Sequence, residues 1–303
     1  MIGRATHRAR GPQFAACALA LFWACPSRSA DLLDDLRANA SLALGVSAGV
    51  ARSSTGTSAL ELKPKPLWAF QYGRIRISTG GAAAVLGVVQ DPRGPGASAE
   101  LFSSEDVRMG IALRIDRGRN SSEVEGLEGM SDVPATLRTR VYASYALTSR
   151  WTTVASVSQD ILGRGGGTVV TADIGYREPM PPASEWYAGL GVSWADVRYM
   201  DSYYGVSPAS AAATGYAAYE PGAGPMNLRA GIGFITALTS RWILFGGAGA
   251  TQLLGYAADS PLTTKRLTAS ASIGLAYRWG AKYEGLASVL LPLPKAPSEE
   301  PAP

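Results

Sequence analysis

Residues 267–279 read LTASASIGLAYRW, and this stretch decides the fold. Its alternate positions are apolar, from Leu267 through Ile273 to Trp279, whereas the positions between them are small, hydroxylated or charged. Side chains that alternate with a period of two point to opposite faces of a β-strand. The polar face, which includes Arg278, is unsuited to packing against a second sheet. A strand of roughly ten residues that is apolar outside and polar inside is typical of a transmembrane β-barrel.

Residues 186–194 show the pattern most informatively, because tryptophans flank an apolar stripe. The separation of eight positions between Trp186 and Trp194 would cover about 20 Å of membrane once the strand is tilted. That span is close to the apolar band of an outer-membrane barrel, with one aromatic ring at each interface. We therefore expect Leu190 to face lipid at mid-depth and Ser193 to face inward, where an arginine should be tolerated.

Seven stretches alternate in this way, and with less regular segments the tally is about eleven, whereas bacterial barrels have an even number of strands. We predict an all-β fold, an antiparallel transmembrane β-barrel of about 12 strands, with 10 as the alternative. Residues 97–102 are the candidate for a short extra strand. The change of phase after Gly73 predicts a bulge. The segments are 41–50, 67–77, 82–89, 107–116, 137–147, 151–161, 170–177, 186–194, 228–238, 242–254 and 267–279.

Residues 1–29 are predicted to be a signal peptide. Three arginines precede an apolar run over residues 14–25, and Ser27 and Ser29 stand at positions −3 and −1 of a cleavage site. Twelve apolar residues are too few to span a bilayer, which takes about 20. A retained membrane anchor is the alternative. We expect residues 30–279 to form the barrel and residues 280–303, rich in proline, to form a disordered periplasmic tail.

Removal of the leader balances the charge of the chain. Four of its 28 basic residues lie in residues 1–29, and the remaining 24 equal its 24 acidic residues, so the composition gives no argument for nucleic acid. Cys17, Cys25 and His7, the only cysteines and histidine, leave with the leader. Without histidine the chain lacks the usual base of hydrolytic enzymes, and no spacing suggests paired catalytic carboxylates. We therefore predict a protein that is not an enzyme and has no cofactor or metal.

Strand parity assigns the connections to two sides. Both ends of such a barrel are expected in the periplasm, so the long loops 199–225 and 253–266 should be extracellular or folded into the lumen. The short turns 148–150 and 239–241, both Thr-Ser-Arg, should be periplasmic. We predict a location in the outer membrane of a Gram-negative cell.

Two loop motifs, with shorter matches elsewhere, resemble the MipA/OmpV family of outer-membrane proteins. The first runs from Asp201 to Ser207 and is followed by tyrosines 216 and 219; the second runs from Leu254 to Pro261. Residues 126–130 and the final strand also match, with Trp279 in place of the usual Phe. The resemblance covers roughly residues 65–279. The candidate site residues, whether structural or binding, are Asp201, Tyr203, Tyr204, Gly205, Val206, Ser207, Gly255, Asp259, Ser260 and Pro261.

The resemblance implies an outer-membrane barrel, and a barrel can host several functions. The best-known member is a scaffold that joins a lytic murein transglycosylase to a bifunctional penicillin-binding protein, and others are linked to adhesion or antibiotic response. We therefore expect a non-enzymatic scaffold whose partners are outer-membrane lipid, a transglycosylase and a penicillin-binding protein. A narrow loop-plugged channel or a surface adhesin is the alternative.

The sequence leaves more than one chemical role open for the candidate residues. The loop tyrosines could form a ligand surface, but they more often pack a loop into a barrel mouth. Asp201 and Asp259 are a weak signal for a cation, and Asp259 reads first as a turn initiator. The inward arginines could line a pore or pair with Asp116, Asp173 and other inward acids. These arginines are Arg108, Arg114, Arg138, Arg140, Arg177, Arg229, Arg266 and Arg278.

Overall fold

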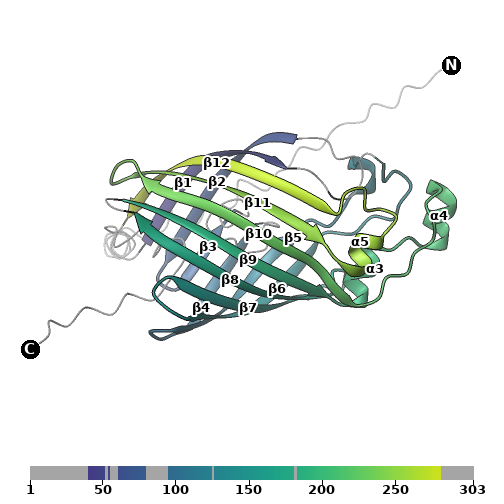
Figure 1. Cartoon of the computed structure of the whole chain (residues 1–303), viewed down its shortest axis with the longest axis horizontal. Helices are drawn as coiled ribbons and strands as arrows, with labels where there is room; N and C mark the ends of the chain where they lie inside the picture. Colours follow the sequence, from purple (N-terminus) through teal and green to yellow (C-terminus); the bar gives the residue numbers. More distant parts are fainter. Residues whose placement is uncertain are drawn as a thin grey trace, which may run out of the picture.

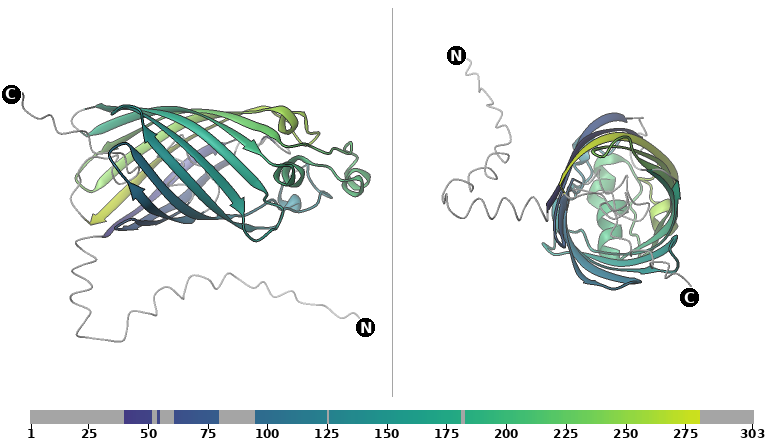
Figure 2. Two further views of the ribbon diagram at one scale, coloured as in Figure 1. Left: turned by 90° about the horizontal axis from the view of Figure 1, so that it is seen from below. Right: turned by 90° about the vertical axis from the view of Figure 1, so that its left-hand side faces the viewer.

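The chain forms a closed antiparallel β-barrel of twelve strands (Figures 1 and 2). The computed structural model describes residues 40–51, 54, 61–79, 95–124, 126–180 and 183–280. Each strand pairs with its neighbours in sequence, and β1 pairs with β12 to close the ring. The strands are β1 Ala40–Ala51, β2 Glu61–Tyr72, β3 Ile75–Ser78, β4 Gly96–Ser103, β5 Val107–Asp116, β6 Thr136–Ala146, β7 Trp151–Asp160, β8 Thr168–Met180, β9 Ser184–Ala195, β10 Gly224–Ala237, β11 Trp242–Leu253 and β12 Leu267–Gly280.

Alternation places apolar side chains on the outside of the barrel, as predicted. On β9 the Leu190 side chain is 53% exposed, whereas Ser193 is 1% exposed. Leu267, Ile273 and Trp279 of β12 likewise face outward and are exposed. Ser193 faces inward as expected, and its buried hydroxyl accepts a hydrogen bond from the Arg229 guanidinium.

The strand count was predicted correctly, but one segment behaves differently. Residues 67–77 are not a bulged strand: β2 ends at Tyr72 and β3 begins at Ile75. Gly73, with φ of +53°, lies in the two-residue turn between them, and a turn changes the apolar phase as a bulge would. The expected extra strand is β4. Segment 82–89, the predicted signal peptide 1–29 and residues 281–303 of the predicted tail lie outside the described residues.

Inward-facing glycines make room for large side chains on the neighbouring strand. Gly110 is paired with Tyr142 and Gly233 with Tyr187, and in each pair the tyrosine side chain lies against the glycine. A β-carbon at either glycine would collide with the tyrosine ring. At these two positions the missing side chain of the glycine leaves room for an aromatic ring that lies across the inner face.

Aromatic rings collect outside the barrel at the end that carries the short turns. Tyr176 lies between Trp151 and Trp186, with ring centroids 5.0 and 5.4 Å apart. Tyr277 contacts Trp242 in the same way, at 5.0 Å. Such a girdle is typical of the interface region of a membrane barrel. None of the helices in the described ranges is long and apolar enough to cross a membrane.

Candidate functional site

Three long loops meet at the barrel end opposite the short turns. They follow β5, β9 and β11 and contain the helices of the structure (Figure 1). These helices are the 3-10 turn η1 Ser121–Glu123, α3 Val197–Tyr204, α4 Pro208–Thr214 and α5 Gly255–Asp259. The loops 199–225 and 253–266 thus share one mouth, and the two Thr-Ser-Arg turns lie at the other end, as strand parity predicted.

Capping residues explain why the loop after β9 is helical. The Asp196 carboxylate accepts a hydrogen bond from the backbone N–H of Tyr199 at 2.8 Å and so begins α3. The Ser207 hydroxyl begins α4 in the same way, with Pro208 at the first helical position. Gly215, with φ of +79°, ends α4. The sequence reasoning did not predict these helices, although the caps are a signal that could have found them.

Helix α3 is held to the ends of the strands by a buried apolar cluster. Tyr199, Met200 and Tyr204 are 2%, 0% and 6% exposed. Their neighbours in the cluster come from strand ends of β8, β9, β10 and β11 and from α5. Three buried side chains thus fix α3 to the strand ends, so this loop lies at the mouth as a folded element. The cluster also contains Val169, Ala195, Met226, Leu253 and Ala257.

A second cluster joins all three loops. Leu127, Val206 and Leu262 come from different loops and are 0%, 1% and 0% exposed. Met130 completes the buried set, and the half-buried Tyr216 packs against it. The motif residues 126–130, 201–207 and 254–261 are distant in sequence, yet their apolar members or immediate neighbours form this one core.

Hydrogen bonds to backbone carbonyls join the loops further. The Ser260 hydroxyl donates to the carbonyl of Tyr204 at 2.6 Å. The Tyr216 hydroxyl donates to the carbonyl of Gly126 at 2.8 Å, and Arg119 Nη1 donates to that of Tyr203 at 2.9 Å. The phenol of Tyr219 donates to the carbonyl of Tyr256 at 2.9 Å. Tyrosine hydroxyls of the loop after β9 thus join it to backbone carbonyls of the loops after β5 and β11.

Arg119 and Asp132 also hold the loops in place, and neither was among the candidate residues predicted from the sequence. Asp132 accepts hydrogen bonds from the backbone N–H and the hydroxyl of Ser121, both at 2.8 Å. These bonds hold the pKa of Asp132 below its usual value, since they stabilise its charged form. A serine ten or so residues before an aspartate is too common a pattern to predict such a contact.

Below the loops, the inner wall is filled by ion pairs and hydrogen bonds. The Tyr203 hydroxyl donates to Asp116 at 3.1 Å, and Arg138 lies 3.9 Å from the same carboxylate. The Arg138 guanidinium also stacks over the Tyr199 ring, 5.5 Å from its centroid. The cavity that remains between β5, β6, β7 and β8 measures about 20 Å³, little more than one water molecule needs. The lumen is closely packed along this wall.

Several inward arginines pair with inward acids, which was one of the two alternatives. Arg229 contacts Asp173 at 2.7 Å, and Arg108 and Arg177 lie 3.9 and 4.0 Å from Glu100 and Glu185. The inward placement expected for Arg266 is wrong. Arg266 precedes β12 and pairs with Asp259 at the mouth, at 2.9 Å, and both side chains are 62% exposed.

The remaining candidates are placed as follows. Asp201 is exposed on α3, and the buried Gly205 ends that helix by donating its N–H to the carbonyl of Asp201 at 2.9 Å. Gly255, with φ of +48°, begins α5, and Pro261 follows the buried Ser260 in the turn after it. Among the described residues no group of three or more His, Cys, Asp or Glu side chains could hold a metal ion.

The geometry defines a class: a closed twelve-stranded barrel with an apolar outer face, three loops packed together at one mouth, and a girdle of aromatics at the other end. A family model described as MltA-interacting protein MipA matches residues 44–279. The chain belongs to this family.

Comparison with individual proteins gives more distant similarities. The MltA-interacting proteins of Escherichia coli (strain K12) and Shigella flexneri are 31% identical over 94 residues, which is 30% of this chain and 36% of each relative. The chain thus spans about a third of the length of these relatives. Among solved structures, the KdgM porin is 6% identical with a TM-score of 0.37, covering 78% of this chain and 98% of the porin. The CymD monoaromatic hydrocarbon channel is 7% identical with a TM-score of 0.40, covering 83% and 91%.

Proposed function

We propose that this chain is a non-enzymatic outer-membrane barrel that acts as a scaffold for a lytic murein transglycosylase at its periplasmic end. Membership of the MipA family carries this proposal, since the relatives that the chain matches are named for an interaction with MltA. A penicillin-binding protein is the second partner that a scaffold would bring to the same end. The apolar outer face would contact the membrane lipid.

The short-turn end offers a specific surface for a periplasmic partner. The pentapeptide LTSRW occurs twice, at residues 147–151 and 238–242, and both copies have the same turn geometry. In each, the threonine hydroxyl accepts hydrogen bonds from the arginine and tryptophan backbone N–H groups at 3.0–3.2 Å. Leu147 and Leu238 are 50% and 55% exposed. Each turn therefore presents a leucine and an arginine in a fixed arrangement.

The contacts of the two arginines leave the turns available. Arg150 pairs with Glu178 at 2.9 Å, but its side chain is 54% exposed, so the pair contributes at most about 1 kcal/mol. Arg241 donates to the Tyr277 hydroxyl at 2.9 Å and is also exposed. This hydrogen bond raises the pKa of Arg241, which stays charged. A partner with an acidic and partly apolar surface would fit both turns.

The test is capture of the transglycosylase from crosslinked envelopes. The double variants Leu147→Ala/Arg150→Ala and Leu238→Ala/Arg241→Ala remove both exposed side chains from one turn and should reduce capture. Arg198→Ala, an exposed arginine on α3 at the other end, is the matched control and should leave capture unchanged. Equal capture by all variants would reject the turns as the contact. Capture lost only with the control would show that the mouth is the binding end.

A narrow channel is the second candidate, and the charged inner wall is the observation that favours it. Inward arginines and acids occur on most strands from β3 to β10, as in a water-filled lumen. The small cavity below α3 argues against free passage on that side. Conductance of the purified protein in planar bilayers separates the two: a scaffold whose mouth is closed should show no steady current.

A further inference from the structure

A long groove hollows the outer wall of strands β8 to β12. Residues that are paired across neighbouring strands line it in two rows. In one row Leu190 of β9 is paired with Ala230 of β10, and Ala230 with Ala250 of β11. The groove has a volume of about 950 Å³ and is open to the surroundings of the barrel. It is hollow because small side chains replace the bulky ones found elsewhere on the outer face. They are Ala188, Ala230, Ala248, Ala250, Ala269 and Ala271.

A second groove of about 640 Å³ lies beside the first, over β5 to β9. Ile174 and Leu190 line both grooves and so form the ridge between them. The floor of the second groove again contains alanines, among them Ala155 and Ala172, which are paired across β7 and β8. The wall thus offers two apolar channels, separated by one ridge of large side chains.

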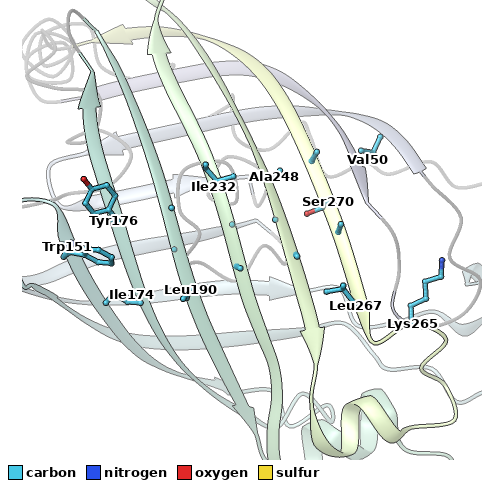
Figure 3. A pocket seen from close by; sticks show the side chains of 18 residues that line it. Val50, Trp151, Ile174, Tyr176, Leu190, Ile232, Ala248, Lys265, Leu267 and Ser270 are labelled. Carbon is cyan, nitrogen blue, oxygen red and sulfur yellow. The ribbon is translucent and has the colours of Figure 1, made fainter.

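The first groove has different chemistry at its two ends (Figure 3). Lys265 lies at the end near the mouth, just before β12 begins. Trp151 and Tyr176 lie at the other end, and their ring centroids are 5.0 Å apart. A lysine beside an apolar surface lays its methylene chain along it and keeps its ammonium group at the polar boundary. An amphiphile with an anionic head group at the mouth and apolar chains below it would match this order.

We propose that the two grooves bind the acyl chains of lipid A, the phosphorylated, multiply acylated anchor of lipopolysaccharide, with a phosphate beside Lys265. The proposal rests on the outer-membrane placement proposed above, in which the mouth lies at the outer leaflet. Two grooves on either side of one ridge suit a lipid with several chains. A lysine at the membrane surface attracts an anionic lipid head group.

A second copy of this chain fits the groove less well, because of Lys265. Packing another barrel here would take water from one side of the Lys265 ammonium group without offering it a counter-ion. The outward side chains that the structure describes on β8 to β12 include one carboxylate, Glu178, and this lies near the short turns, where it contacts Arg150 at 2.9 Å. A copy docked in the same orientation therefore brings no carboxylate from these strands to Lys265.

Lipid binding by the full chain in detergent micelles tests the proposal, measured by native mass spectrometry with lipid A, dephosphorylated lipid A and phosphatidylglycerol as probes. Ala250→Phe and Ala230→Phe fill the groove and should weaken lipid A binding about tenfold. Ala48→Phe, at an exposed outward alanine of β1 that does not line either groove, should bind as the wild type does. Lys265→Gln should reduce the preference for lipid A over its dephosphorylated form about fivefold, the effect of one lysine at an anionic surface.

Three results would overturn the proposal: equal lipid A binding by wild type and both phenylalanine variants, phosphatidylglycerol binding as tight as lipid A, or a dimer that Ala250→Phe dissociates. The last would identify a second copy as the occupant. Heat modifiability on gels confirms that each variant has folded as a barrel. Capture of the transglycosylase by the same variants is a separate readout, so failure of lipid binding and failure of the scaffold role are distinguishable.

Discussion

Ser260 joins two of the mouth loops through one buried hydroxyl, and its replacement tests how much the loops depend on such bonds. Ser260→Ala removes the donor to the Tyr204 carbonyl and the acceptor of the Leu262 N–H, 3.2 Å away. Because the site is buried, each unsatisfied group costs about 1–3 kcal/mol. We expect faster proteolysis within the mouth loops.

The matched control is Ser149→Ala, an exposed serine in a turn at the other end of the barrel. It should leave the proteolysis pattern unchanged. If Ser260→Ala resists protease as well as the wild type does, the hydroxyl does not hold the loops together, and the apolar cores around Leu127 and Met200 would be sufficient.

Single residues also show where prediction from sequence stops. Asp196 and Ser207 begin helices that were not predicted, although both are good capping residues, because each helix is short and lies between polar, glycine-containing segments. Arg266 was assigned inward by extending the β12 alternation one residue too far. The contact between Leu127 and Leu262 joins residues far apart in the chain, and no local pattern carries such information.

At the scale of the element, a strand with a period of two is readily predicted, because its signal is local and repeats several times. The face assignment of β9 was therefore correct. The turn at Gly73 was mistaken for a bulge because both shift the phase by one residue. Pairing partners and strand ends depend on the neighbouring strand, and so could be fixed only by the structure.

The expected position of Leu190 at the middle of the membrane can be tested by substitution. Leu190→Arg should destabilise the barrel by about 2–4 kcal/mol, the cost of a basic residue on the lipid face at mid-depth. Leu267→Arg, at the mouth end of β12, should cost only about 0–1 kcal/mol because the side chain reaches the interface. Urea unfolding in lipid vesicles, followed by tryptophan fluorescence, measures both. Equal costs would mean that Leu190 does not lie at mid-depth.

At the scale of the whole molecule, the two ends of the barrel differ in construction, which suggests different tasks. Two buried clusters and a network of hydrogen bonds hold the loops together at the mouth, whereas the other end has short turns and an aromatic girdle. The barrel and its polarity could be predicted from alternation and parity. The closing of the mouth could not, since it depends on contacts between three loops.

Removal of residues 203–216 tests this division. The deletion takes away Tyr203, Tyr204 and Val206, so both clusters lose members and the mouth should open. We expect greater permeability to small solutes in a liposome-swelling assay. Deletion of residues 208–214 alone removes α4 and leaves those three side chains in place, so its effect should be smaller.

The same variants report on the partner. If the transglycosylase binds at the short-turn end, both loop deletions should capture it as the wild type does. Removal of residues 281–303, which follow β12 in the sequence and form the proposed periplasmic tail, should weaken capture. A loop deletion that still folds, as judged by heat modifiability, but loses the partner would place the contact at the mouth. That result would reverse the assignment of the two ends and leave the LTSRW turns with a purely structural role.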